Sequence, residues 1–123
     1  MDRNGFQDWM EALGRHWETK DSRGFSELFA EGIDYHFTPF EEPKRGRSEV
    51  EEAVERAHAT QGGIKFGHEI LSFQDDTGIC RWWCDFTRTT TGKPIRLDGI
   101  LICEFDPNDF CRTFREWCLK DGE

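Results

Sequence analysis

The spacing of the apolar residues changes once along this chain, from a helical period in the first half to strand-like runs in the second. The first pattern places five large apolar residues at the i, i+3, i+4 and i+7 positions of one helical face, namely Phe6, Trp9, Met10, Leu13 and Trp17. Polar side chains fill the opposite face. The pattern therefore predicts an amphipathic helix that ends between residues 19 and 21.

The second pattern consists of four runs with the composition of strands, over residues 66–73, 79–89, 95–105 and 110–118. Short clusters rich in Asp, Gly, Thr, Pro or Asn separate these runs. Because short connections join antiparallel neighbours, the runs predict a four-stranded meander. Helices followed by a meander predict an α+β domain in which the helices cover one face of an antiparallel sheet.

A second, short helix is predicted directly after the first. Asp21 or Ser22 has the side chain to cap its first turn, and Gly32 is of the type that ends a helix. Its buried side is expected to consist of Phe25, Leu28 and Phe29.

A strand over residues 33–37 and a third helix over residues 49–60 are predicted before the meander begins. Ser48 and Glu51 have the spacing of a capping box at the start of this third helix. The glycine pair at 62–63 is expected to end it. Three helices thus precede the meander.

The length and charge of the chain limit its organisation and its partners. Its 123 residues match one domain, so residues 1–123 are predicted to form a single unit. The net charge is −9 and the basic residues are scattered, which disfavours nucleic acids and anionic membranes as partners. The sequence has no apolar run of the ~20 residues that span a bilayer and no signal-peptide pattern at its start, so a cytoplasmic location is expected.

Five cysteines are present, an odd number, and no two form a CxxC pair. We therefore expect buried free thiols rather than a disulfide framework or a zinc site. Neither a metal site nor a cofactor is predicted.

Two segments carry a resemblance to a known family. They are WETKDSRGFSELFAEGIDYHFTPFEEPKRGRSEVEEAV at residues 17–54 and LDGILICEFDPNDFCRTFREWC at residues 97–118. Their order and spacing resemble the nuclear transport factor 2-like superfamily, and specifically its SnoaL-like bacterial members. The resemblance covers essentially the whole chain. It implies a cone-shaped fold with an apolar pocket, usually in a homodimer, but the superfamily holds cyclases, isomerases, hydrolases and non-catalytic domains, so the fold does not decide the function.

The steroid isomerases of this superfamily provide a direct test of one chemistry. They use a tyrosine on the first helix, an aspartate just before the proline that follows the first strand, and a protonated acid on the penultimate strand, an arrangement that is a known example of tuned acidity. Leu13, Thr38 and Leu101 occupy the corresponding positions in this chain. The sequence therefore predicts that this protein is not a steroid isomerase.

Counting from the positions that this resemblance assigns, alternation along the strands divides the meander side chains into two faces. The inward set is predicted to be Cys80, Trp82, Cys84, Phe86, Leu97, Gly99, Leu101, Cys103, Phe105, Phe114, Glu116 and Cys118. Trp83, Ile100 and Ile102 are expected to point outward and to form an apolar patch suited to a homodimer interface.

Glu116 and His36 are the candidate catalytic residues. An acid among inward aromatic side chains has its pKa raised by burial and can transfer protons near neutral pH. His36 is expected at the mouth of the cone, where an imidazole can do the same. A structural histidine, and a Glu116 that is exposed or paired with a neighbouring arginine, are the alternatives.

The sequence favours the binding of a small apolar molecule in the cone, with acid–base catalysis of an isomerase, cyclase or dehydratase type as one use of such a pocket. The residues predicted to contact the ligand are Trp17, Thr38, His68, Trp82, Phe86, Leu101 and Phe114. The alternative is a non-catalytic dimeric module whose cavity is filled by its own aromatic side chains and which serves as a structural or partner-binding domain.

Overall fold

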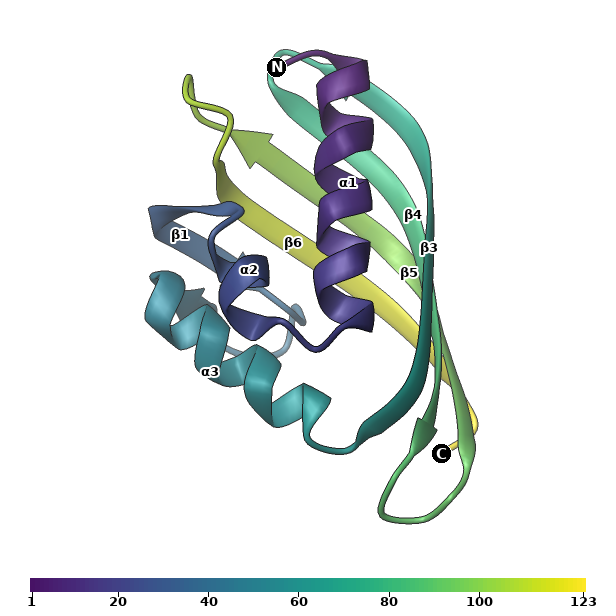
Figure 1. The fold of residues 1–123 in the computed structure, drawn as a ribbon. Helices are drawn as coiled ribbons and strands as arrows, with labels where there is room; N and C mark the ends of the chain where they lie inside the picture. The colour runs from purple at the N-terminus through teal and green to yellow at the C-terminus, as the bar shows by residue number, and fades with distance from the viewer.

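A computed structural model describes all 123 residues, and its helices and strands alternate less simply than the sequence predicts (Figure 1). The elements are α1 (Arg3–Glu18), α2 (Ser22–Ser26), β1 (Phe29–His36), β2 (Lys44–Arg45), α3 (Arg47–His58), β3 (Gln61–Gln74), β4 (Thr77–Arg88), β5 (Pro94–Phe105) and β6 (Cys111–Asp121). The fold is α+β, with the helices packed against a curved sheet, as predicted.

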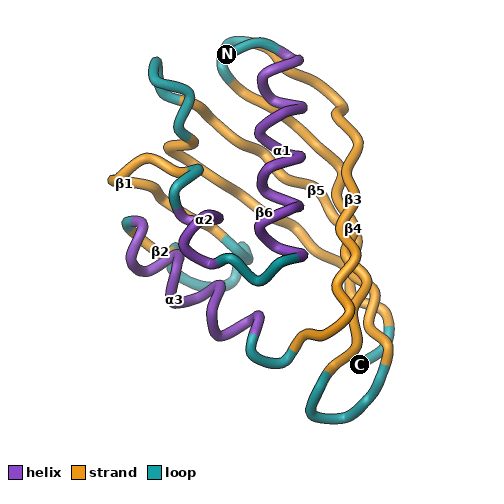
Figure 2. The backbone as a smooth tube through the Cα atoms, viewed as in Figure 1, coloured by secondary structure: helices purple, strands orange, loops and turns teal.

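The sheet has six strands in the order β2-β1-β6-β5-β4-β3. Strands β3 to β6 form the predicted antiparallel meander. Strand β1 adds to its edge by pairing in parallel with β6, and the two-residue β2 pairs with β1. Figures 1 and 2 show the sheet curving around α1, while α2 and α3 lie beside the end of α1. The meander and the strand predicted over residues 33–37 are thus present in one sheet, and β2 is the strand that was not predicted.

Helix α1 buries the predicted face. Phe6, Trp9, Met10 and Leu13 are all at most 6% exposed. The Asp2 side chain accepts a hydrogen bond from the Gly5 amide and caps the first turn, and the helix ends at Thr19. The rings at the start of the helix pack edge-on against Phe105 of β5 and at a tilt against Phe73 of β3, so aromatic contacts join α1 to the sheet.

The alternation predicted for the meander holds in its central strands. Each of the inward residues Cys80, Trp82, Cys84, Phe86, Leu101, Cys103, Phe105 and Phe114 is at most 5% exposed. Of the other predicted inward residues, Leu97, Gly99 and Glu116 are half-buried and Cys118 is exposed. Its thiol and those of the other four cysteines are free.

The second helix is shorter than predicted, because a strand begins where its last turn was expected. Asp21 caps α2 by accepting a hydrogen bond from the Gly24 amide, as predicted. Phe29 belongs to β1, however, and the Cys111 amide donates to the Leu28 carbonyl. The parallel pairing with β6 thus replaces the helical hydrogen bonds that residues 27–32 would have made.

Both ends of α3 also differ from the prediction. The residue before the helix is Gly46, with φ of 85°, and no side chain caps the first turn. Ser48 therefore lies inside the helix and forms no capping box. The helix ends at His58, and the two glycines predicted to end it lie in β3 instead.

No helix in the structure combines the length and the apolar character needed to cross a bilayer.

Candidate functional site

A cavity of about 440 Å³ opens between the concave face of the sheet and the helices. Helix α1 ends at Glu18, one residue beyond the lining residue Trp17, and α3 supplies four residues to the lining. Nineteen residues line it: Leu13, Trp17, Phe25, Tyr35, Phe37, Glu41, Lys44, Ala53, Val54, Arg56, Ala57, Gln61, Phe66, Trp82, Cys84, Leu97, Leu101, Phe114 and Glu116. All three helices and all six strands contribute to this lining.

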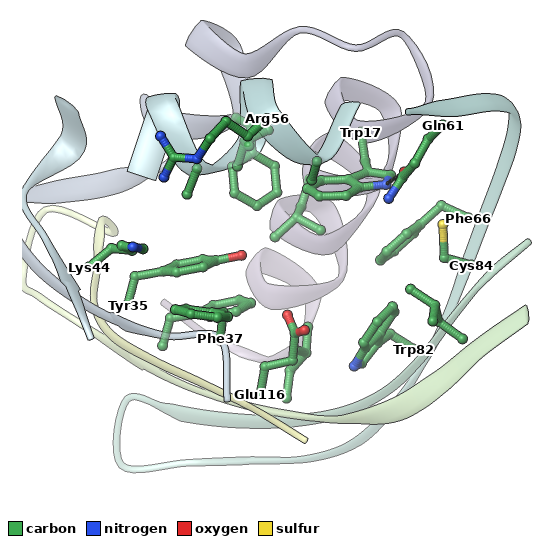
Figure 3. Close-up of a pocket in the computed structure, with 18 of the residues that line it drawn as sticks. Trp17, Tyr35, Phe37, Lys44, Arg56, Gln61, Phe66, Trp82, Cys84 and Glu116 are labelled. Atoms are coloured by element: carbon green, nitrogen blue, oxygen red, sulfur yellow. Dashed lines mark hydrogen bonds between the residues drawn. The ribbon is translucent and has the colours of Figure 1, made fainter. Parts of the chain in front are cut away.

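One wall of the cavity is made of two indoles and a phenyl ring (Figure 3). The Trp17 side chain comes from the last turn of α1 and is fixed by a hydrogen bond of 3.1 Å from its Nε1 to Oε1 of Gln61. Phe66 of β3 stacks on Trp82 of β4 with an interplanar angle of 12°. The Trp82 Nε1 is buried without a hydrogen-bond partner. This wall is rigid and almost entirely apolar.

The opposite wall is built on the parallel pair of β1 and β6. Tyr35 and Phe114 are register partners, and their rings stack with centroids 4.6 Å apart and an interplanar angle of 4°. Two residues after Phe114, on the same face of β6, Glu116 points into the cavity toward the Tyr35 side (Figure 3). The parallel pairing thus places a phenol and a carboxyl group at the same end of an aromatic cavity.

Glu116 has no hydrogen bond and no ion pair within the chain, and burial alone raises its pKa to about 8. The arginine pairings considered for it do not form, since Arg88 pairs with Glu123 and neither Arg112 nor Arg115 makes an ion pair. Burial, and next the neighbouring Glu116 charge, also raise the pKa of Tyr35 well above its usual value. Near neutral pH this part of the cavity therefore holds two protonated oxygens.

Charged side chains gather at another part of the lining. Lys44 on β2, Arg56 on α3 and Glu41 in the preceding loop face the cavity there. The Lys44 ammonium lies 5.5 Å from the centre of the Phe37 ring. Neither Lys44 nor Arg56 has a carboxylate within ion-pair distance, whereas the adjacent Arg45 pairs with Asp34 and Glu42.

These groups allow acid–base chemistry. A protonated carboxyl group with a pKa near 8 can give a proton to a bound molecule, and its anion can take one back, while the phenol donates a hydrogen bond. No group of three or more His, Cys, Asp or Glu side chains is arranged to hold a metal ion.

Five of the nine predicted site residues come together in the cavity. They are Trp17, Trp82, Leu101, Phe114 and Glu116. The predicted orientation of His36 is wrong. Tyr35 faces the cavity because it is in register with Phe114, so alternation turns His36 to the other face of β1.

Thr38, His68 and Phe86 also lie outside the cavity lining. Thr38 follows the end of β1 and lines a separate groove. Phe37 and Glu116 line both this groove and the cavity. His68 does point toward the helices, but its Nε2 lies 3.0 Å from Oε1 of Gln7, under α1. Phe86 is buried farther along β4, where the Arg88 guanidinium lies 5.0 Å from its ring centre.

Tyr35, Lys44, Arg56 and Gln61 also line the cavity and were not predicted from the sequence. Tyr35 had one available signal, because Ile33, Tyr35 and Phe37 form an apolar set at alternate positions of the first strand. Lys44 and Arg56 had none, since isolated basic residues in a loop and on a helix are typical of solvated surfaces. Gln61 was expected near the end of a helix, not at the start of β3.

One buried histidine lies behind the cavity wall. His58, at the end of α3, is 4% exposed and neither of its ring nitrogens has a hydrogen-bond partner. Its ring packs edge-on against Trp17 at 4.4 Å between centroids. Burial, and next the charge of Lys20, lower its pKa from 6.5 to about 4. His58 is therefore neutral at pH 7 and supports the position of Trp17.

Solved structures share this fold at low sequence identity. A Bacillus subtilis protein that its name assigns provisionally to the isomerases superposes with a TM-score of 0.84, at 17% identity over 97% of this chain and 90% of that chain. The epoxide hydrolase/cyclase-like enzyme SalBIII, which has a role in pyran ring formation in the polyether salinomycin, gives 0.83 at 11% identity over 96% and 93%.

A third structure is a hypothetical protein of Catenulispora acidiphila with a ketosteroid isomerase-like fold, in complex with trimethylamine. It gives a TM-score of 0.78 at 11% identity, over 89% of this chain and 83% of that chain. These likenesses establish the fold alone. No curated protein matches the chain.

The family assignment follows from the sequence of the chain itself. Residues 6–112, which include most of α1, all of α2 and α3 and strands β1 to β5, match the SnoaL-like domain family. The chain therefore belongs to the SnoaL-like domain family of the nuclear transport factor 2-like superfamily.

Proposed function

We propose that this protein binds a small, mainly apolar molecule in the cavity and exchanges a proton with it through Glu116. The observation that carries the proposal is a carboxyl group without any partner in an aromatic cavity, with a pKa of about 8. Glu116 is half-buried among aromatic side chains and has no protein partner, an arrangement that costs folding free energy and therefore favours a functional role.

The size of the cavity supports binding. Its 440 Å³ lies within the ~300–1,000 Å³ typical of small-molecule sites, and 14 of its 19 lining residues are hydrophobic. A module whose own aromatic rings filled the cone would leave no such space. Members of this fold that are named as cyclase-like or isomerase-like enzymes are consistent with a ligand in this position.

The proposed chemistry uses two groups. The Glu116 carboxyl group gives its proton to a carbonyl or ether oxygen of the bound molecule, or its anion removes a proton from an adjacent carbon. The Tyr35 hydroxyl donates a hydrogen bond to the oxygen that becomes negative. Leu13 and Leu101 line the same cavity as apolar residues, so the steroid isomerase arrangement is absent.

The test is a screen of apolar carbonyl compounds by thermal shift, followed by calorimetry and by product analysis of each binder. We expect a binder whose conversion is lost in Glu116→Gln while its dissociation constant changes by less than about threefold. Binding without conversion of any compound would favour the non-catalytic alternative, and the absence of any binder would contradict the proposal.

Filling the cavity should abolish binding without unfolding the protein. Ala57 lines the cavity from α3, and Ala57→Leu adds three carbon atoms to the space while keeping a good helix former. We expect at least a tenfold loss of affinity by calorimetry, with the melting temperature within a few degrees of the wild type. Ala59→Leu, on the exposed residue that ends α3, is the matched control and should bind normally.

We also propose a homodimer formed by the outer face of the sheet. Ile100 and Ile102 are partly exposed there, and Trp117 and Leu119 of the adjacent strand are 41% and 79% exposed. Ile100→Asp should convert the dimer to a monomer in sedimentation velocity, because it places an unpaired charge in the apolar patch. A dimer that persists in this variant would exclude this face.

A further inference from the structure

We infer that the molecule bound in the cavity carries a carboxylate at one end, held by Lys44 and Arg56, and an apolar body that reaches the Trp82 wall. This inference rests on the proposed function and adds a substrate class, an apolar carboxylic acid. Its basis is the position of the two cations in the lining and the absence of an ion pair between either cation and a carboxylate of the chain.

The register of β2 turns Lys44 toward the cavity. Lys44 is the pairing partner of Tyr35, whose ring lines the cavity, so both side chains lie on the same face of the sheet. Arg45, the next residue, points the other way and pairs with Asp34 at 3.6 Å and Glu42 at 3.5 Å. Arg45, the outward cation of β2, thus has two carboxylate partners, whereas Lys44, the inward cation, has none.

Arg56 also forms no ion pair, although a carboxylate is available on its own helix. Glu52 lies four residues before it on α3, the better orientation for an ion pair on a helix. The pair does not form, although the shorter helix α2 does form an ion pair between Arg23 and Glu27. Figure 3 shows the Arg56 guanidinium extending to the same side of the cavity as Lys44.

The two cations and the aromatic wall define the orientation of the ligand. Figure 3 places Lys44 and Arg56 on one side of the cavity, Trp17, Phe66 and Trp82 on the other, and Glu116 below the space between them. A carboxylate at the first side accepts two parallel hydrogen bonds from a guanidinium, and the apolar body then lies against the indoles. This orientation brings the middle of the molecule to Glu116.

The two cations outnumber the one carboxylate that lies with them in the lining. Glu41 is the one other carboxylate in the lining; it is exposed and forms no ion pair with either cation. Below pH 8 the Glu116 carboxyl group is mainly protonated. The cavity of a chain with net charge −9 is therefore locally positive on one side.

The test compares three probes of nearly equal shape at pH 7, namely phenylbutanoate, phenylbutanamide and phenylbutylamine, by calorimetry at low salt. We expect the carboxylate to bind about tenfold more tightly than the neutral amide, and the amine most weakly. Added salt should reduce the advantage of the carboxylate, because the cations lie near the surface.

The variants separate the inference from the proposed function. In Lys44→Gln with Arg56→Gln, the carboxylate and the amide should bind equally, while the amide keeps its wild-type affinity within about twofold. Arg15→Gln removes a positive charge from an exposed, unpaired arginine outside the cavity and should keep the full preference.

Equal affinities in the wild type, or a preference for the amine, would overturn the carboxylate assignment and leave apolar binding intact. A preference that survives in the double variant would overturn the role of the two cations. If neither the carboxylate nor the amide binds, both this inference and the proposed function fail.

Discussion

Between pH 5 and pH 8 the wild-type protein is expected to lose about 3 kcal/mol of unfolding free energy that the Glu116→Gln variant retains. The pKa of Glu116 is about 8 in the folded protein and 4.5 as its ordinary value. Over this range the unfolded chain releases the proton and the folded protein keeps it, so the unfolded state is favoured as the pH rises. A difference of one bound proton over three pH units changes the unfolding free energy by about 4 kcal/mol. The opening of the cavity to water reduces this value.

Urea unfolding at intervals of half a pH unit measures this difference. Glu69→Gln is the control, because Glu69 is exposed on β3 and its removal should leave the pH dependence of the wild type unchanged. Parallel curves for the wild type and Glu116→Gln would show that Glu116 ionises normally and would remove the basis for proton transfer. We also expect Glu116→Gln to be the more stable protein at pH 8 and the less active one, a relation typical of functional sites.

Between pH 6.5 and pH 4 His58 is expected to reduce the unfolding free energy by about 3 kcal/mol. The unfolded histidine takes up a proton below pH 6.5, whereas the folded one remains neutral until about pH 4, so acid favours the unfolded chain over this window. His58→Leu removes the titrating ring and the two unpaired nitrogens while keeping an apolar contact with Trp17. The variant should be more stable than the wild type, and increasingly so as the pH falls.

The measurement is the difference between the two proteins, because carboxylates elsewhere titrate in the same range in both. His36→Gln controls for the loss of a histidine, since His36 is partly exposed on β1. A constant difference between His58→Leu and the wild type from pH 7 to pH 4 would contradict the expectation. Fluorescence can also report the solvent exposure of Trp17. An increase in this exposure at acid pH that is absent from His58→Leu would place the effect at the cavity wall.

Much of this fold can be predicted from the local periodicity of apolar side chains. The face of α1 from Phe6 to Leu13 and the inward set from Cys80 to Phe86 follow from the 3.6-residue and two-residue repeats of apolar side chains. Repeats of this kind depend only on near neighbours, so they can be read before the fold is known. The inward position of Glu116 was predicted from alternation along the last strand, on the face that the family resemblance assigned.

The rest of the site depends on a contact between distant parts of the chain. Because β1 pairs in parallel with β6, Phe29 lies in a strand and not in the predicted helix. The same pairing makes Tyr35, rather than His36, face the cavity. One residue of register decides which side chains of a strand face inward, and here a partner about 80 residues away sets that register.

The sequence by itself determined the helix face, the meander and an acid among aromatic residues. The tertiary structure decided that the single tyrosine, Tyr35, lines the cavity with that acid and that Lys44 and Arg56 lie at the same cavity. The physical reason is that apolar periodicity is a local property of the chain, whereas the assembly of a site requires long-range strand pairing whose stability comes from the whole core.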